Sequence, residues 1–177
     1  MYKRQIGNNV KFGSNNKEVS QQELDDVCET ADILDTIQLL ENGYETILGE
    51  RGVNLSGGQK QRLSIARSLL RKPEILVLDD CLSAVDTETE DKILKELQKE
   101  NEDRTTVIVS HRISTIRNAK EIIVIEEGRL VEKGSHSVLL KKKGFYFDLY
   151  KKQQSDLKGD KTKSNEHDTG ETFGEAN

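Results

Sequence analysis

The stretch that decides the fold is Ile75-Leu76-Val77-Leu78-Asp79-Asp80. Four consecutive apolar residues that follow a proline and end in two acids are typical of a strand buried on both faces of a parallel sheet. Charges at the carboxyl end of such a strand usually meet a ligand, because ligands bind at that edge of open α/β sheets. The stretch therefore predicts a parallel strand that delivers Asp79 and Asp80 to a binding edge.

The next segment predicts a second strand parallel to the first. Thr87 can cap a helix whose apolar stripe contains Ile93 and Leu97. The β-branched run Thr105 to Val109 then reads as a strand, and His111 follows its end. Because strand, helix and strand follow one another, we expect a parallel crossover.

Helices are expected before the first strand. Residues 18–40 carry apolar side chains at roughly helical spacing, which predicts one or two helices with a wet face. Glycines in residues 42–52 indicate a loop. Ser56 and Gln59 fit a capping box, in which each residue satisfies a backbone N–H of the other. A helix should therefore begin there and end before Pro73.

The C-terminal third reads as small elements followed by a polar tail. We expect a helix at about Ser114 to Asn118, a hairpin of Glu121 to Ile125 with Arg129 to Glu132, and two helices near Val138 and over Phe145 to Gln153. Beyond Gln154 the residues are mostly charged or small and polar. Such a segment has too little apolar surface to offset the entropy of ordering, so disorder is expected.

Composition excludes several classes of protein. The chain has 177 residues, a net charge of -5 and 33% charged residues, which predicts a single domain without affinity for nucleic acid. No apolar run approaches the roughly 20 residues of a membrane helix, and the first residues do not read as a secretory signal. Cys28 and Cys81 are too few for a disulfide framework or a zinc site, which favours a reduced, cytosolic segment.

Several residues have the chemistry to bind a nucleotide. Ser56, Gly57 and Gly58 at a helix start let backbone N–H groups and the positive helix end approach a phosphate, although an ordinary capped helix is the alternative. The Asp79 carboxylate is suited to hold Mg²⁺ through a water molecule. The alternative is that Asp79 is only a solvated acid at the end of a strand. His111 could donate to a phosphate or position a water molecule, or it could be inert.

These residues resemble the motifs of one family in order and spacing. Over nearly all of residues 6–153 the sequence is similar to the nucleotide-binding domain of ATP-binding cassette (ABC) transporters of the exporter type. The counterparts are the signature motif at Leu55 to Gln59, the Walker B strand at Ile75 to Asp79, the D-loop at Ser83 to Asp86 and the switch histidine His111. Thr46 to Gly52 resembles the exporter loop that contacts the membrane domain.

The resemblance implies a set of ligands and roles. ATP and Mg²⁺ would be the ligands, and the chain would pair with a second ABC nucleotide-binding domain. Asp79 would hold the metal, and Asp80 and His111 would be catalytic. The signature residues would act on the partner's nucleotide: Leu55, Ser56, Gly57, Gly58 and Gln59. The D-loop residues would lie at the interface: Ser83, Ala84 and Asp86. Asp86 could instead be a cap or turn acid, and Gln61 and Arg62 are expected to be scaffold residues.

The resemblance also implies an architecture. The expected fold is α/β, a P-loop NTPase-like parallel sheet core with an ABC α-helical subdomain. Residues 1–13 are expected to follow the glutamine loop, and residues 14–72 to form a helical subdomain with the signature. Residues 73–153 are expected to form the ATP-binding core, and residues 154–177 a disordered tail. His136 and His167 are expected at the surface, and Lys141 to Lys143 as a solvated helix end.

Two departures from the family pattern stand out. The sequence contains no G-x-x-x-x-G-K-[ST] motif, so we expect that the chain alone does not hold ATP in the usual way and that the N-terminal strands of the core are missing. Asp80 and Cys81 stand where the family usually has glutamate and proline. An aspartate draws the carboxylate back by on the order of 1 Å, and a misplacement of that size can cost about a hundredfold in rate. This resembles the degenerate half of heterodimeric exporters.

The functional expectation is an ATPase segment of an exporter, inactive when alone. The membrane domain would precede it on the parent chain, and the segment would lie at the cytoplasmic face of the cell membrane. A non-transport ABC ATPase is one alternative. A catalytically inert half that only completes the partner's ATP site is the other.

Overall fold

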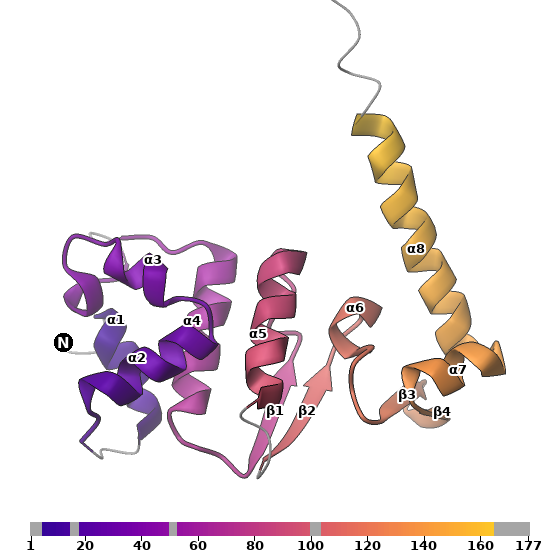
Figure 1. The fold of residues 1–177 in the computed structure, drawn as a ribbon, viewed down its shortest axis with the longest axis horizontal. Helices are drawn as coiled ribbons and strands as arrows, with labels where there is room; N and C mark the ends of the chain where they lie inside the picture. The colour runs from indigo at the N-terminus through magenta and orange to yellow at the C-terminus, as the bar shows by residue number, and fades with distance from the viewer. Residues whose placement is uncertain (1–4, 15–17, 50–52, 100–103, 165–177) are drawn as a thin grey trace, which may run out of the picture. The chain divides into compact units, whose positions relative to one another are not determined.

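The computed structural model describes residues 5–14, 18–49, 53–99 and 104–164. These residues form two compact units that divide after His111, and each unit has its own hydrophobic core (Figure 1). Mixed helices and a parallel strand pair confirm the expected α/β class. Residues 50–52 of the expected exporter loop, the first four residues and His167 lie outside the described part of the chain.

The first unit opens with a group of helices. Two helices occupy residues 18–40, as the apolar spacing predicts, whereas the helix at residues 6–11 is not anticipated by the sequence pattern. The elements are α1 (Ile6–Lys11), the 3-10 turn η2 (Phe12–Ser14), α2 (Gln21–Thr30), α3 (Leu34–Gln38), the 3-10 turn η3 (Gly43–Glu45) and α4 (Gly57–Leu69).

Close backbone contact fixes the first helices against α4. A Cβ atom on Gly13 would lie 2.1 Å from the carbonyl oxygen of Arg67, so only glycine fits where η2 meets α4. Leu24 and Cys28 of α2 are buried in the same apolar cluster as Leu63 of α4. The start of α4 is therefore supported by the helices that pack against it.

The predicted capping box at the start of α4 is confirmed. The Gln59 backbone N–H donates to Ser56 Oγ at 3.2 Å, and the Ser56 N–H donates to the Gln59 side-chain oxygen at 2.9 Å. These two bonds satisfy backbone donors that a helix start otherwise leaves unpaired. They also define where the helix begins.

Two parallel strands follow the helical layer. Strand β1 (Ile75–Asp79) pairs with β2 (Thr105–Val109), with Ile75 opposite Thr105 and Asp79 opposite Val109. Helix α5 (Thr87–Lys99) connects the strands and runs beside them (Figure 1). The predicted parallel crossover is therefore confirmed.

The expectation that β1 is buried on both faces is wrong. Leu76 and Leu78 are 3% and 4% exposed and join the core with residues of α4 and α5, whereas Ile75 and Val77 are 66% and 60% exposed. Side chains alternate between the faces of a strand, and in the described part of the chain only one face of the strand pair is covered. The other face is an exposed apolar surface.

The second unit is a hairpin with three helices. Its elements are α6 (Ile113–Ile116), β3 (Ile122–Glu126), β4 (Arg129–Gly134), α7 (His136–Lys142) and α8 (Phe145–Ser164). The predicted hairpin is confirmed, and its two turn residues, Glu127 and Gly128, both have positive φ, as a tight two-residue hairpin turn requires.

Two expectations for this unit differ from the structure. Helix α8 continues to Ser164, beyond the expected end at Gln153 and into the segment for which disorder was expected. His136 is half-buried rather than a surface residue, since its Nδ1 lies 2.7 Å from the Tyr146 hydroxyl and its ring packs edge-on against Tyr146 and Tyr150. Among the helices described, none combines the length and apolarity needed to cross a bilayer.

Candidate nucleotide site

The acids and the histidine predicted from the sequence follow two adjacent strand ends. Asp79 is the last residue of β1, and the Asp80 backbone N–H donates to the carbonyl oxygen of Val109, the last residue of β2, at 2.9 Å. His111 follows two residues after Val109. All three side chains are exposed, so this edge of the sheet presents two carboxylates and an imidazole to solvent.

Asp80 begins a tight turn. Its φ is +44°, in the left-handed region that aspartate tolerates better than most residues. The Asp80 carbonyl oxygen accepts from Ser83 Oγ at 2.9 Å and from the Ser83 N–H at 3.3 Å. The D-loop residues therefore fold back on the residue that follows the Walker B strand.

The signature residues form the turn that starts α4. Ser56 and Gly57 are exposed, and the first N–H groups of a helix point outward from such a turn. Leu55 is 7% exposed and belongs to the core, so its side chain anchors the turn. The side-chain oxygen of Gln59 is engaged in the capping box. A direct nucleotide contact by Leu55 or Gln59 stays a prediction.

The D-loop lies directly against the signature turn of the same chain. A Cβ atom on Gly58 would lie 2.7 Å from the Ala84 carbonyl oxygen, and one on Gly57 would lie 3.4 Å from the Ala84 Cβ. The sequence reading explained both glycines by the approach of a phosphate. For Gly58 the structure adds a reason within the chain, because any side chain there would collide with the D-loop backbone.

Gln61, expected to be a scaffold residue, links the start of α4 to the D-loop, a contact that the sequence reading did not anticipate. Its side-chain oxygen accepts from the Ala84 N–H at 2.9 Å, and its Nε2 donates to Ser83 Oγ at 3.0 Å and, at 3.4 Å, to the Asp80 carbonyl oxygen. The available signal was spacing: residue 61 lies one helical turn after Gly57 and Gly58, so it shares their face of α4.

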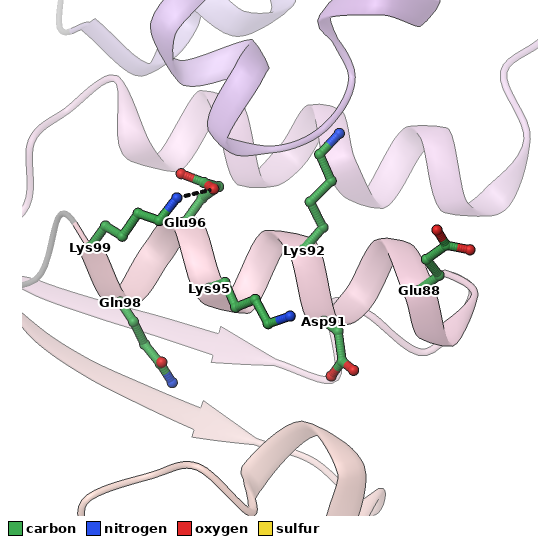
Figure 2. Close-up of a pocket in the computed structure, with 7 residues that line it drawn as sticks. All are labelled: Glu88, Asp91, Lys92, Lys95, Glu96, Gln98 and Lys99. Carbon is green, nitrogen blue, oxygen red and sulfur yellow. Dashed lines mark hydrogen bonds and ion pairs between the residues drawn. The ribbon is translucent and has the colours of Figure 1, made fainter.

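Arg62 connects three elements through Asp32. Arg62 Nη1 donates to Asp32 Oδ2 at 3.1 Å and also to the Asp32 carbonyl oxygen. Lys92 of α5 pairs with the other carboxylate oxygen, and this bond and the nearby charge raise the pKa of Lys92. Figure 2 shows the Lys92 side chain reaching toward the helical layer. Arg62 is therefore a scaffold residue, as expected.

Asp86 caps α5. Its Oδ1 accepts from the Thr89 N–H at 3.0 Å, and its carbonyl oxygen accepts from the Glu90 N–H at 2.9 Å. The backbone and side-chain hydrogen bonds of Thr89 lower the pKa of Asp86. The expectation that Thr87 is the cap is wrong by one residue, because Asp86 provides the acceptor. The role of Asp86 at a domain interface stays a prediction.

Cys81 is a half-buried neutral thiol beside the acids. Burial raises its pKa to about 11, and the negative charges of Asp80, Asp79 and Glu90 act in the same direction. Both Cys28 and Cys81 are free, as the cysteine count predicts. Cys81 is partly buried and packs against the core of the first unit.

A shallow hollow lies along α5, and Lys92 is one of the residues that line it. Its lining comes entirely from this helix, with an ion pair between Lys99 and Glu96 at 2.7 Å (Figure 2). Alternating charges on an exposed helix face are typical of a solvated surface. Within the described ranges no group of three or more potential metal ligands occurs, so a metal would depend on few protein ligands.

Comparison with known proteins gives a family match and several relatives. Residues 2–83 match the family model described as "ABC transporter". The chain is 48% identical over 149 residues to the multidrug resistance-like ATP-binding protein MdlA of Escherichia coli, covering 84% of this chain and 25% of that protein. It is 45% identical over 148 residues to an ATP-dependent lipid A-core flippase of Photorhabdus laumondii, with the same coverage of 84% and 25%.

A solved structure extends the likeness to three dimensions. A bacterial Atm1-family ABC exporter with ATP bound superposes with a TM-score of 0.80 at 42% identity, covering 86% of this chain and 27% of that one. The fold matches that of an ABC nucleotide-binding fragment, and residues 2–83 match the ABC transporter family. The solved structure is an ABC exporter by its title. The chain spans about a quarter of the length of the proteins that it matches.

Proposed function

We propose that this chain supplies the signature and Walker B portion of an exporter's ATPase, which couples ATP binding and hydrolysis at a dimer interface to transport. The observation that carries the proposal is the joined arrangement of the two motifs. The signature turn of α4 and the turn after β1 lie against each other through Gly58 and Ala84 and are bonded through Gln61. One chain can thereby present both motifs to a single partner surface.

The residues fit ATP and Mg²⁺. Mg²⁺ keeps most of its waters and takes one or two carboxylates with phosphate oxygens, so the exposed Asp79 at the strand end suffices as a protein ligand. The exposed Ser56 and Gly57 at the start of α4 suit the γ-phosphate of a nucleotide held by a partner domain. Bound Mg²⁺ would supply charge neutralisation of the phosphates.

We infer an asymmetric pair of sites. Asp80 and His111 are the proposed catalytic residues of this chain's own site, and Asp80 carries the shorter carboxylate. The signature residues would complete the other site, which belongs to a partner domain with a full-length glutamate. A heterodimer therefore fits better than a homodimer.

The proposal places a transmembrane domain on the same parent chain and this segment at the cytoplasmic face of the membrane. Support comes from the relatives, which are about four times as long as the matched region and are named as a multidrug resistance-like ATP-binding protein and a lipid A-core flippase. The same names argue against an ABC ATPase without a transport role. The inert binding half remains the second candidate, favoured by Asp80 and by the lack of a phosphate-loop motif in the sequence.

Isothermal titration with Mg-ATP tests the proposal. The chain alone should bind no nucleotide at micromolar concentration, because the phosphate loop provides most contacts in this class. The exporter that carries the chain should bind in that range. Micromolar binding by the chain alone would mean that it forms a complete site, and the proposal would be wrong.

A further inference from the structure

We propose that Gln61 is a positioning residue for ATP hydrolysis. Gln61 fixes the D-loop on the signature turn, so that both segments reach the partner's nucleotide in a defined geometry. This inference rests on the proposed function and extends it to a residue outside the motifs named above. Gln61 lies on α4, and the D-loop residues that it contacts are 22 and 23 positions further along the chain.

The hydrogen bonds of Gln61 use both ends of its amide. The oxygen accepts from the Ala84 N–H at 2.9 Å, and Nε2 donates to Ser83 Oγ at 3.0 Å. Ser83 Oγ in turn donates to the Asp80 carbonyl oxygen at 2.9 Å. A continuous set of hydrogen bonds therefore runs from the signature helix to the residue that follows the Walker B aspartate.

Steric contact with the start of α4 prevents the D-loop from moving closer to that helix. The Ala84 carbonyl oxygen occupies the space where a Cβ atom on Gly58 would be, at 2.7 Å. The D-loop backbone already touches the start of α4 and cannot move closer. Because Gln61 prevents movement away, the two constraints together define the position of the D-loop.

The backbone of Asp80 is part of the same arrangement. Asp80 is held at a φ of +44°, and its carbonyl oxygen receives bonds from Ser83 and a longer one from Gln61 at 3.4 Å. Releasing Gln61 would therefore loosen the signature turn, the D-loop and the acid together. Displacements of about 1 Å near a reacting centre can lower rates by about a hundredfold.

A positioning role differs from a stabilising role in what it predicts. Gln61 is only half-buried, so water can replace its hydrogen bonds when the side chain is changed. Stability should fall little, while the geometry of the D-loop should change. Activity and stability should then respond differently to the same substitution.

The experiment uses the exporter that carries this chain, with matched variants. Gln61→Met keeps the length and removes every hydrogen bond, whereas Gln61→Glu keeps the acceptor for the Ala84 N–H and loses the donors. Gln98→Met is the control, because Gln98 is an exposed glutamine on α5 (Figure 2). The measurements are kcat and KM of ATP hydrolysis, the Tm of each variant, and amide exchange of Ala84 in the chain.

We expect Gln61→Met to lower kcat by at least about tenfold with KM within about twofold and Tm within about 4 °C of wild type. Exchange of the Ala84 amide should be faster in Gln61→Met than in wild type. Gln61→Glu should retain more ATPase activity than Gln61→Met. Gln98→Met should match wild type in every measurement. An active wild type with an unchanged kcat in Gln61→Met would overturn the positioning role. A wild-type exporter without ATP hydrolysis would overturn the proposed function itself.

Discussion

The carbonyl oxygen of Ala84 lies 2.7 Å from the point where a Cβ atom on Gly58 would be placed. Cβ atoms do not approach other atoms this closely in folded proteins, so Gly58 is required by packing within the chain. The neighbouring Gly57 has a Cβ position 3.4 Å from the Ala84 Cβ, which is an ordinary contact. Packing within the chain therefore requires glycine at position 58 but not at position 57, although both belong to one motif.

Alanine at these two positions should affect stability differently. Gly58→Ala should lower the free energy of unfolding by about 1–3 kcal/mol, because backbone must shift to make space. Gly57→Ala should leave it unchanged or raise it by up to about 1 kcal/mol, because alanine favours the helix. Urea denaturation of the chain measures both values. Equal losses in the two variants would contradict the packing role of Gly58.

The link between Asp32 and Arg62 should contribute to stability. Asp32 has a φ of +51° and its side chain is 18% exposed. Asp32→Asn keeps a residue that tolerates this conformation but removes the charge and one of the two acceptor oxygens, so a loss of about 1–2 kcal/mol is expected. Glu96→Gln is the control, because it removes an exposed pair with Lys99 and should cost less than about 0.5 kcal/mol. Similar losses in both variants, measured by urea denaturation, would argue against the link.

Cys81 should react slowly with alkylating reagents. Its pKa of about 11, against an ordinary value of 9.0, leaves about a hundredfold less thiolate at pH 8. The raised pKa also means that the folded state holds this proton more tightly, so stability should fall as the pH rises from 9 to 11. Peptide mapping after timed alkylation follows Cys81 separately from Cys28. Rapid labelling of Cys81 at pH 8 in the folded chain would show that the thiol is not shielded.

The exposed face of the strand pair should cause self-association of the chain. Val77 and Val107 are 60% and 44% exposed on the uncovered face. An exposed apolar sheet face and open strand edges are recognised causes of association. Light scattering should detect oligomers of the wild type and fewer of the double variant Val77→Thr and Val107→Thr, with Lys95→Thr on the charged face of α5 unchanged. A monodisperse wild-type monomer would contradict this prediction.

The sequence predicts the elements whose signals are local. The capping box of Ser56 and Gln59 and the apolar run of β1 depend on neighbouring residues, and both are confirmed. The D-loop contacts of Gln61 and the exclusion of a side chain at Gly58 join segments far apart in the chain, so no local pattern reveals them. Burial of β1 depends on what covers each face, which is a tertiary property.

The catalytic and binding roles depend on groups outside the chain. Asp79, Asp80 and His111 could be placed at one sheet edge from their position after the strands, and the structure confirms that placement. Their roles toward a nucleotide remain predictions, because under the proposed function a partner domain would provide the rest of the site.

Steady-state ATP hydrolysis by two variants of the full exporter tests the central claim most directly. Asp80→Asn should reduce turnover only a few-fold, because in the proposed asymmetric pair the site containing Asp80 would already be slow. Gly57→Asp should reduce it by more than about a hundredfold, since its carboxylate would repel the γ-phosphate at the partner's competent site. That pattern is the result predicted for an asymmetric pair of sites. If Asp80→Asn abolishes turnover as completely as Gly57→Asp, Asp80 is a working catalytic acid and two equivalent sites describe the exporter better.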